Sequence, residues 1–93
     1  MTLKQLQVFL AVARFQNLTQ AAEALFLTKG AVSQALQELE RHLGVRLFDR
    51  VHPHLRLNHE GARLWPLADE MLQRAEGIER TFQAGGACFL SIG

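Results

Sequence analysis

Polar side chains recur at helical spacing between residues 29 and 37. Lys29, Ser33 and Gln37 lie four positions apart, and so do Gly30 and Gln34, which places all five on one side of a helix. Their amino, hydroxyl and amide groups donate and accept hydrogen bonds, as the recognition of base edges in the major groove of DNA requires. The alternative is an ordinary surface helix whose polar face is only solvated. This stretch alone leaves both interpretations open.

The other side of this helix is apolar. Val32, Leu36, Leu39 and Leu43 recur at steps of four, three and four residues. Thr28 directly precedes the helix and is a suitable N-cap, because its hydroxyl can accept a hydrogen bond from a backbone N–H of the first turn.

Two helices are predicted before it. The first begins near Leu3, because Thr2 and Gln5 form a capping-box pattern, and its apolar stripe is expected to comprise Leu3, Leu6, Phe9, Leu10, Val12 and Ala13. Asn17 is a plausible left-handed stop. The second, shorter helix has Thr19 as its expected N-cap and an apolar side of Ala21, Ala22 and Leu25. Residues 18–37 therefore read as a helix-turn-helix.

A β-hairpin is predicted after these helices. Gly44 occupies a C-cap position. Apolar and polar residues then partly alternate over 45–50 and again over 55–57, on either side of a turn that contains Pro53. A hairpin over residues 46–57, directly after a helix-turn-helix, is a wing that would lie on the DNA backbone or in the minor groove.

A long helix is predicted from residue 59 to about 83, with Asn58 as its N-cap. It would be about 37 Å long, with a slight kink at Pro66. Its apolar seam follows heptad spacing and comprises Leu64, Ala68, Met71, Ala75, Ile78 and Phe82. A second copy of the helix would cover this seam. The alternative is that the seam folds back on the first helix.

Composition favours a binding domain. The chain has 93 residues and a formal net charge of +1, which suits one small globular domain. Residues 1–58 carry seven Lys or Arg against four acids, and residues 59–93 carry three against five. The basic excess thus coincides with the helix-turn-helix.

Other classes are disfavoured. Lone Cys88 fits a reducing compartment, and neither a signal sequence nor an apolar run of about 18 residues is present, so we expect a cytoplasmic protein with no membrane contact. No paired carboxylates, activated nucleophile or phosphate-binding glycine loop suggests an enzyme, and no cofactor is expected. A metal site of His52, His54 and His59 is conceivable, but no cysteine or carboxylate cluster supports it.

The last residues suggest a longer protein. Gly85 and Gly86 would end the long helix as a hinge, and residues 87–93 read as the start of a strand without a partner. We therefore expect 85–93 to begin a further domain.

The chain resembles the LysR-type transcriptional regulators over nearly its full length. The matching text comprises residues 3–13, 19–25, 31–34, Leu39-Glu40, the string Leu-Gly-Val-Arg-Leu-Phe-Asp-Arg at 43–50, and Leu-Ser-Ile-Gly at 90–93. The resemblance implies a mainly α fold: a winged helix-turn-helix of three helices and a hairpin over 1–58, then a dimerising linker helix over 59–84. It also implies a bacterial regulator that binds an inverted repeat in double-stranded DNA as a homodimer, with a small-molecule inducer bound only by a further C-terminal domain.

Carried over by position, the resemblance predicts DNA contacts at the start of the recognition helix, near a helix N-terminus and on the wing. With Gln37 and the wing-tip histidines, the expected contacts are Thr19, Thr28, Lys29, Gly30, Ser33, Gln34, Gln37, Arg50, His52 and His54. Lys29 and Gln34 would read bases, whereas Thr19, Thr28 and Arg50 would hold phosphates, and Ser33 could do either.

Two positions depart from the family pattern. Gly30 stands where a more helix-compatible residue is usual, and would let the backbone approach DNA closely. The wing tip carries histidines instead of an arginine. Its binding to the minor groove would therefore be weaker or pH-dependent, since histidine gains a proton at about pH 6.5. A rival function is a dimerising interaction module, or a truncated regulator, without sequence-specific DNA binding.

Overall fold

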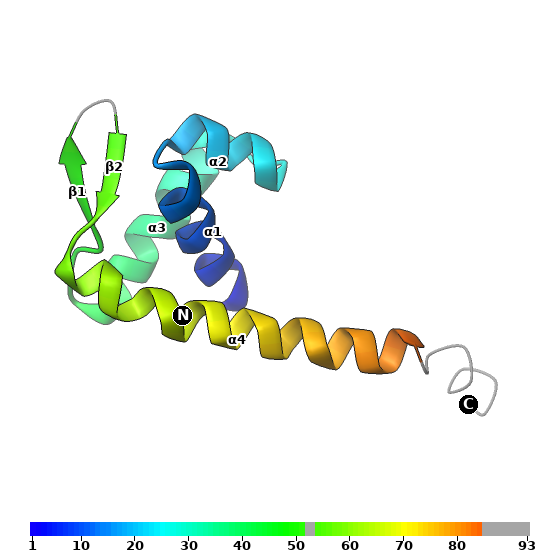
Figure 1. Cartoon of the computed structure of the whole chain (residues 1–93). Coiled ribbons are helices and arrows are strands. Elements are labelled where there is room, and N and C mark those ends of the chain that lie inside the picture. The colour runs from blue at the N-terminus through cyan, green and yellow to red at the C-terminus, as the bar shows by residue number, and fades with distance from the viewer. Residues whose placement is uncertain (52–53, 85–93) are drawn as a thin grey trace.

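A computed structural model describes residues 1–51 and 54–84. Its elements, in chain order, are α1 (Leu3–Phe15), α2 (Leu18–Leu25), α3 (Lys29–Leu43), β1 (Phe48–Val51), β2 (His54–Leu57) and α4 (His59–Ala84). Figure 1 shows α1, α2 and α3 packed together, the hairpin projecting beside them, and α4 crossing beneath and extending well past them. The predicted mainly helical, winged fold is confirmed. The His52–Pro53 turn, the hinge and the strand after it lie outside the described residues.

Local capping chemistry sets most helix boundaries. The capping box is confirmed, because Gln5 N donates to Thr2 Oγ1 and Thr2 N donates to Gln5 Oε1. Thr28 caps α3 by accepting from Ala31 N at 3.0 Å. Gly44 ends α3 in the left-handed conformation with φ of 74°, which glycine adopts without steric cost.

The junction between α1 and α2 differs from the prediction. Asn17 is not a left-handed stop but the N-cap of α2, and its Oδ1 accepts from Gln20 N at 3.0 Å. Gln16 takes the left-handed conformation instead, with φ of 55°. Thr19 is therefore not the cap, because asparagine caps at least as well as threonine and allows α2 to begin at Leu18, which packs against the core.

The core lies where α1 meets α2, α3 and the hairpin. Val8, Phe9, Val12, Ala21, Val32 and Leu39 are fully buried. Because α1 is covered by several elements, its buried arc is shifted from the predicted stripe: Val8 belongs to it, whereas Leu3 is exposed. Leu43, in the last turn of α3, is also exposed, because it lies past the core.

The hairpin is anchored at its base. β1 and β2 pair antiparallel, with Arg50 opposite Leu55 and Val51 opposite His54. Leu47, Phe48 and Leu55 are buried, and the Phe48 ring lies 5.5 Å from that of Phe9. The wing is thus fixed relative to the helices.

Helix α4 begins at a cap that also holds the hairpin. Asn58 Oδ1 accepts from Gly61 N, and its Nδ2 donates to the Arg46 carbonyl, both at 2.8 Å. The helix continues through Pro66, and Ala68 is buried against the core. Within residues 1–51 and 54–84, no helix is both long and apolar enough to cross a membrane.

Candidate DNA-binding surface

Four predicted contacts, on four different elements, meet at one depression. Thr19 from α2, Lys29 from α3, Arg50 from β1 and His54 from β2 line a hollow of about 330 Å³. The hydrogen bond from Leu55 N to the Gln16 carbonyl, 3.1 Å long, fixes β2 against the turn before α2. The N-terminal ends of α2 and α3 lie at this hollow, and helix N-termini favour anions. The arrangement suits a phosphate backbone.

The start of α3 presents a polar, accessible face. Lys29, Gly30 and Gln34 are exposed, and Ser33 is half-buried. Gly30 faces open space, since a Cβ added there would meet no atom within 4 Å. Thr28 is exposed, but its hydroxyl is already used as the N-cap. Its role is therefore at least partly structural.

The amide of Gln34 is held by a neighbour. Its Nε2 donates to Glu38 Oε1, and Gln5 Nε2 from α1 donates to Glu38 Oε2, both at 3.2 Å. A bidentate contact with adenine needs both the amide N–H and the carbonyl oxygen. The Nε2 group carries a second N–H, so Gln34 can keep its bond to Glu38 while that N–H and its carbonyl oxygen make such a contact.

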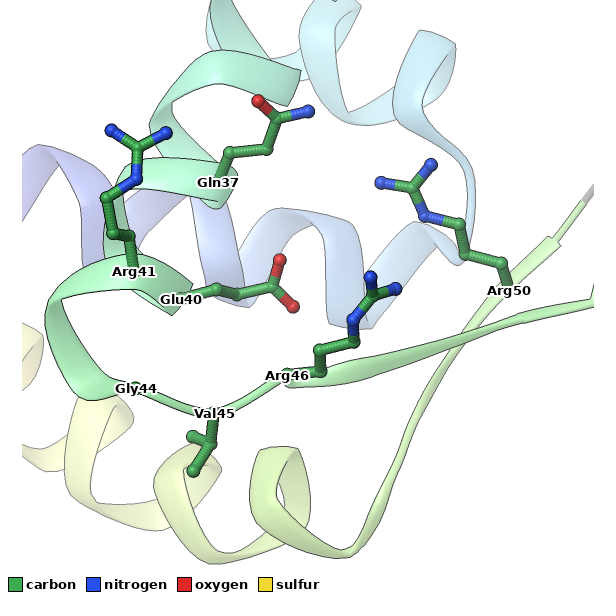
Figure 2. Close-up of a pocket in the computed structure, with 7 residues that line it drawn as sticks. All are labelled: Gln37, Glu40, Arg41, Gly44, Val45, Arg46 and Arg50. Carbon is green, nitrogen blue, oxygen red and sulfur yellow. The ribbon is translucent and has the colours of Figure 1, made fainter.

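A second, larger depression lies between α3 and the wing. It measures about 620 Å³ and includes the predicted residues Gln37 and Arg50. Figure 2 shows Gln37, Glu40 and Arg41 on α3, Arg46 on the segment between α3 and β1, and Arg50 on β1, and all five line the depression. Arg41 and Arg46 were missed by sequence reasoning. Arg41 could have been found, because it lies one helical turn after Gln37.

The predicted contacts do not all share one hollow. Arg50 links the two depressions, since it lines both. Thr28, Gly30 and Gln34 line neither and lie on open surface. His52 lies outside the described residues. In the described part of the chain, no group of three or more His, Cys, Asp or Glu side chains is arranged to hold a metal ion.

The predicted seam on α4 divides into two parts. Ala68 is buried, and Leu64 packs against the core of the same chain, as the fold-back alternative requires. Beyond them, Met71 is 48%, Ile78 61% and Phe82 59% exposed. This second part of the seam thus presents apolar surface at the outside of the single chain.

The sequence matches the family model of the bacterial regulatory helix-turn-helix protein, lysR family, over residues 3–62. The chain belongs to this family. Among its LysR-family relatives, it is 46% identical over 82 residues to YeiE, an uncharacterised HTH-type transcriptional regulator of Escherichia coli K12. It is 42% identical over 84 residues to the HTH-type transcriptional regulator CfxR of Cupriavidus necator. These matches cover 88% and 90% of this chain but only 28% and 26% of the two relatives.

Solved structures of LysR-family proteins have the same fold. A variant of OxyR from Corynebacterium glutamicum superimposes with a TM-score of 0.88 at 32% identity, over 91% of this chain and 26% of that one. The DNA-binding domain of CbnR, solved as a complex with DNA, gives a TM-score of 0.84 at 30% identity, over 92% of this chain and 99% of that domain. The chain thus corresponds in extent to a LysR DNA-binding domain.

Proposed function

We propose that the chain binds double-stranded DNA in a sequence-specific manner as the DNA-binding part of a bacterial LysR-type transcriptional regulator. The observation that carries this proposal is the depression lined by Thr19, Lys29, Arg50 and His54. It joins two helix N-termini and the wing on one surface, and the similarity to a domain solved with DNA supports the same use. A regulator of this kind would act in the cytoplasm, on the chromosome.

The start of α3 would enter the major groove, with the wing on the adjacent backbone and minor groove. Lys29 would read guanine and Gln34 adenine. Thr19 and Arg50 would bind phosphates, which fixes the register of the protein on DNA without reading its sequence. His54, and His52 if the wing tip reaches that far, would meet the minor groove or its rim.

Two copies would bind together through the outer part of α4. Met71, Ile78 and Phe82 expose apolar surface that a second α4 can cover, with Ala75 beside them and with Leu64 and Ala68 holding the helix to its own domain. A twofold dimer presents two recognition helices, and therefore favours an inverted repeat with half-sites about one helical turn apart.

Selection from a randomised pool of duplexes, at moderate salt, tests this proposal. Enrichment of an inverted repeat is the expected result. Enrichment of single half-sites would contradict the proposed dimer but would still support base reading by the start of α3. Recovery of no sequence above background would refute DNA reading and favour a dimerising interaction module.

The selected duplex then tests the division of roles. Gln34→Ala should relax preference at one base position of each half-site, because a base-edge contact is lost. Arg50→Ala should weaken all sequences alike and flatten the dependence of affinity on salt, because a phosphate contact is lost. Binding titrations on the selected site and on single-base variants of it measure both effects. A uniform loss with Gln34→Ala would show that the assignment of roles is wrong.

A further inference from the structure

The arginines of the two halves of this chain differ in their pairing. On α4, Arg63, Arg74 and Arg80 each lie within 4.0 Å of a carboxylate one turn earlier, on Glu60, Glu70 and Glu76 respectively. No carboxylate in the described residues forms such a pair with Arg41, Arg46 or Arg50, although all three are exposed. Among the described residues, the positive charges between α3 and the wing are therefore not held in ion pairs.

These three unpaired arginines line the same depression. Arg41 comes from α3, Arg46 from the segment between α3 and the wing, and Arg50 from β1. Figure 2 shows that Arg46 lies between Glu40 and Arg50, and that Gln37 and Arg41 stand one turn apart on the facing helix. The wing and α3 are fixed relative to each other by buried Leu47 and Phe48. The depression is thus a preformed site for an anion.

The position of this depression identifies the anion. If α3 occupies a major groove and the wing the adjacent minor groove, the sugar–phosphate strand that separates the two grooves must pass between α3 and the wing. Arg41 lies about 18 Å along α3 from Lys29, whereas the major groove is only about 12 Å wide. Arg41 therefore stands at the wall of the groove, where phosphates lie, and not over base edges.

We infer that this intervening DNA strand binds in the depression, and that Arg41 and Arg46 contact its phosphates together with Arg50. The inference rests on the proposed function and extends its contact surface toward the base of the wing. Both guanidinium groups offer several N–H donors in a plane that matches phosphate geometry. Because they contact phosphates, they contribute affinity and register but no base preference.

The negative charge of Glu40 lowers the affinity of this depression for an anion. It is the one carboxylate among the residues that line the depression, and its Oε2 accepts from Leu47 N at 2.7 Å. That bond fastens the start of the wing to α3 and holds the negative charge next to Arg46. Removing the charge while keeping an acceptor, as in Glu40→Gln, should therefore strengthen binding of an anion.

The test uses the whole 93-residue chain and the duplex obtained by selection. Affinity is measured over a range of salt concentrations for Arg41→Gln, Arg46→Gln, the double variant and Glu40→Gln. Arg74→Gln is the matched control, because it removes one exposed arginine that is already paired on α4. Melting followed by circular dichroism establishes that each variant is folded.

Arg41→Gln and Arg46→Gln should each reduce the slope of log affinity against log salt by about 1 per protomer, and should weaken binding to all sequences alike. Glu40→Gln should raise affinity several-fold, and Arg74→Gln should change neither slope nor affinity. If the double variant keeps the wild-type slope while the wild type still selects its site, the inference is overturned and the proposed function stands. An unchanged affinity in Glu40→Gln overturns the inference too, even if the arginine variants fail to fold. Failure of the wild type to bind any duplex overturns the proposed function itself.

Discussion

Replacing Gly30 with alanine should separate folding stability from DNA binding. Gly30 is the second residue of α3, and an added Cβ would meet no atom within 4 Å. In a helix interior, glycine costs about 1 kcal/mol relative to alanine, largely because the unfolded chain gains freedom. Because Gly30 lies in the first turn, about half of that figure is expected. Gly30→Ala should thus stabilise the fold by about 0.5 kcal/mol, or raise the melting temperature by about 2–4 °C.

The same methyl group should weaken DNA binding. Gly30 is exposed on the face that would enter the major groove, where glycine would allow the backbone to approach DNA closely. A methyl group in that contact would displace the backbone or force the DNA away. Loss of a contact comparable to a good bidentate base contact costs about 1–3 kcal/mol, which corresponds to a loss of affinity of about 5- to 150-fold.

Thermal melting and fluorescence anisotropy with the selected duplex measure these two effects on the same preparations. Gly77→Ala is the control, since Gly77 also faces open space but lies on α4, far along the chain from α3. The Gly77→Ala variant should be more stable than the wild type by about 1 kcal/mol and should bind DNA with unchanged affinity. Light scattering establishes that its oligomeric state is also unchanged. If Gly30→Ala is stabilised and binds DNA as tightly as the wild type, the backbone at Gly30 does not approach DNA closely, and this explanation of the glycine is wrong.

Two further substitutions test the packing of α4. Gly61→Ala should lower the free energy of unfolding by about 1–3 kcal/mol, because the added Cβ would overlap the Leu47 carbonyl oxygen and lie 2.7 Å from Leu57 Cδ2. Urea unfolding measures this change. A urea midpoint above that of the wild type would show that α4 does not pack on Leu47 in this way. Ile78→Glu should shift the monomer–dimer equilibrium at least tenfold toward monomer, because it places a charge on apolar surface that is 61% exposed in the single chain. Gln73→Glu adds the same charge to another exposed position on α4 and should leave sedimentation unchanged, whereas equal effects of both would contradict the assigned seam.

Rules that act over a few residues predicted most element boundaries. The Thr2–Gln5 capping box, the Thr28 cap, the glycine end of α3 at Gly44 and the Asn58 cap are all present. Each depends on a side chain that reaches a backbone group three residues away or on a backbone conformation that glycine favours. The error at Asn17 and Thr19 has the same local origin, because both residues can cap and only packing of Leu18 selects between them.

Features that depend on two distant segments were not predicted. The buried state of Val8, the close approach of Gly61 to Leu47 and the hydrogen bond from Gln5 to Glu38 each require knowledge of which elements pack together. The division of the α4 seam has the same cause. Heptad spacing marks an apolar stripe but not the point at which the helix leaves its own domain, and in the structure the buried part ends near Ala68.

The small net charge of the chain is consistent with DNA binding, because the positive and negative charges lie in different parts of the structure. The five acids of residues 59–93 exceed the three arginines there, and those arginines are paired within α4. The seven basic residues of 1–58 exceed four acids, and of these acids Glu40 is bonded to the backbone of the wing. DNA would therefore be attracted to the face formed by α3 and the wing and weakly repelled by α4, which orients the approach. A dimer doubles the positive excess carried by residues 1–58 from +3 to +6. Dimerisation through α4 would therefore strengthen binding by placing two such domains on one duplex, not by raising the overall charge of each chain.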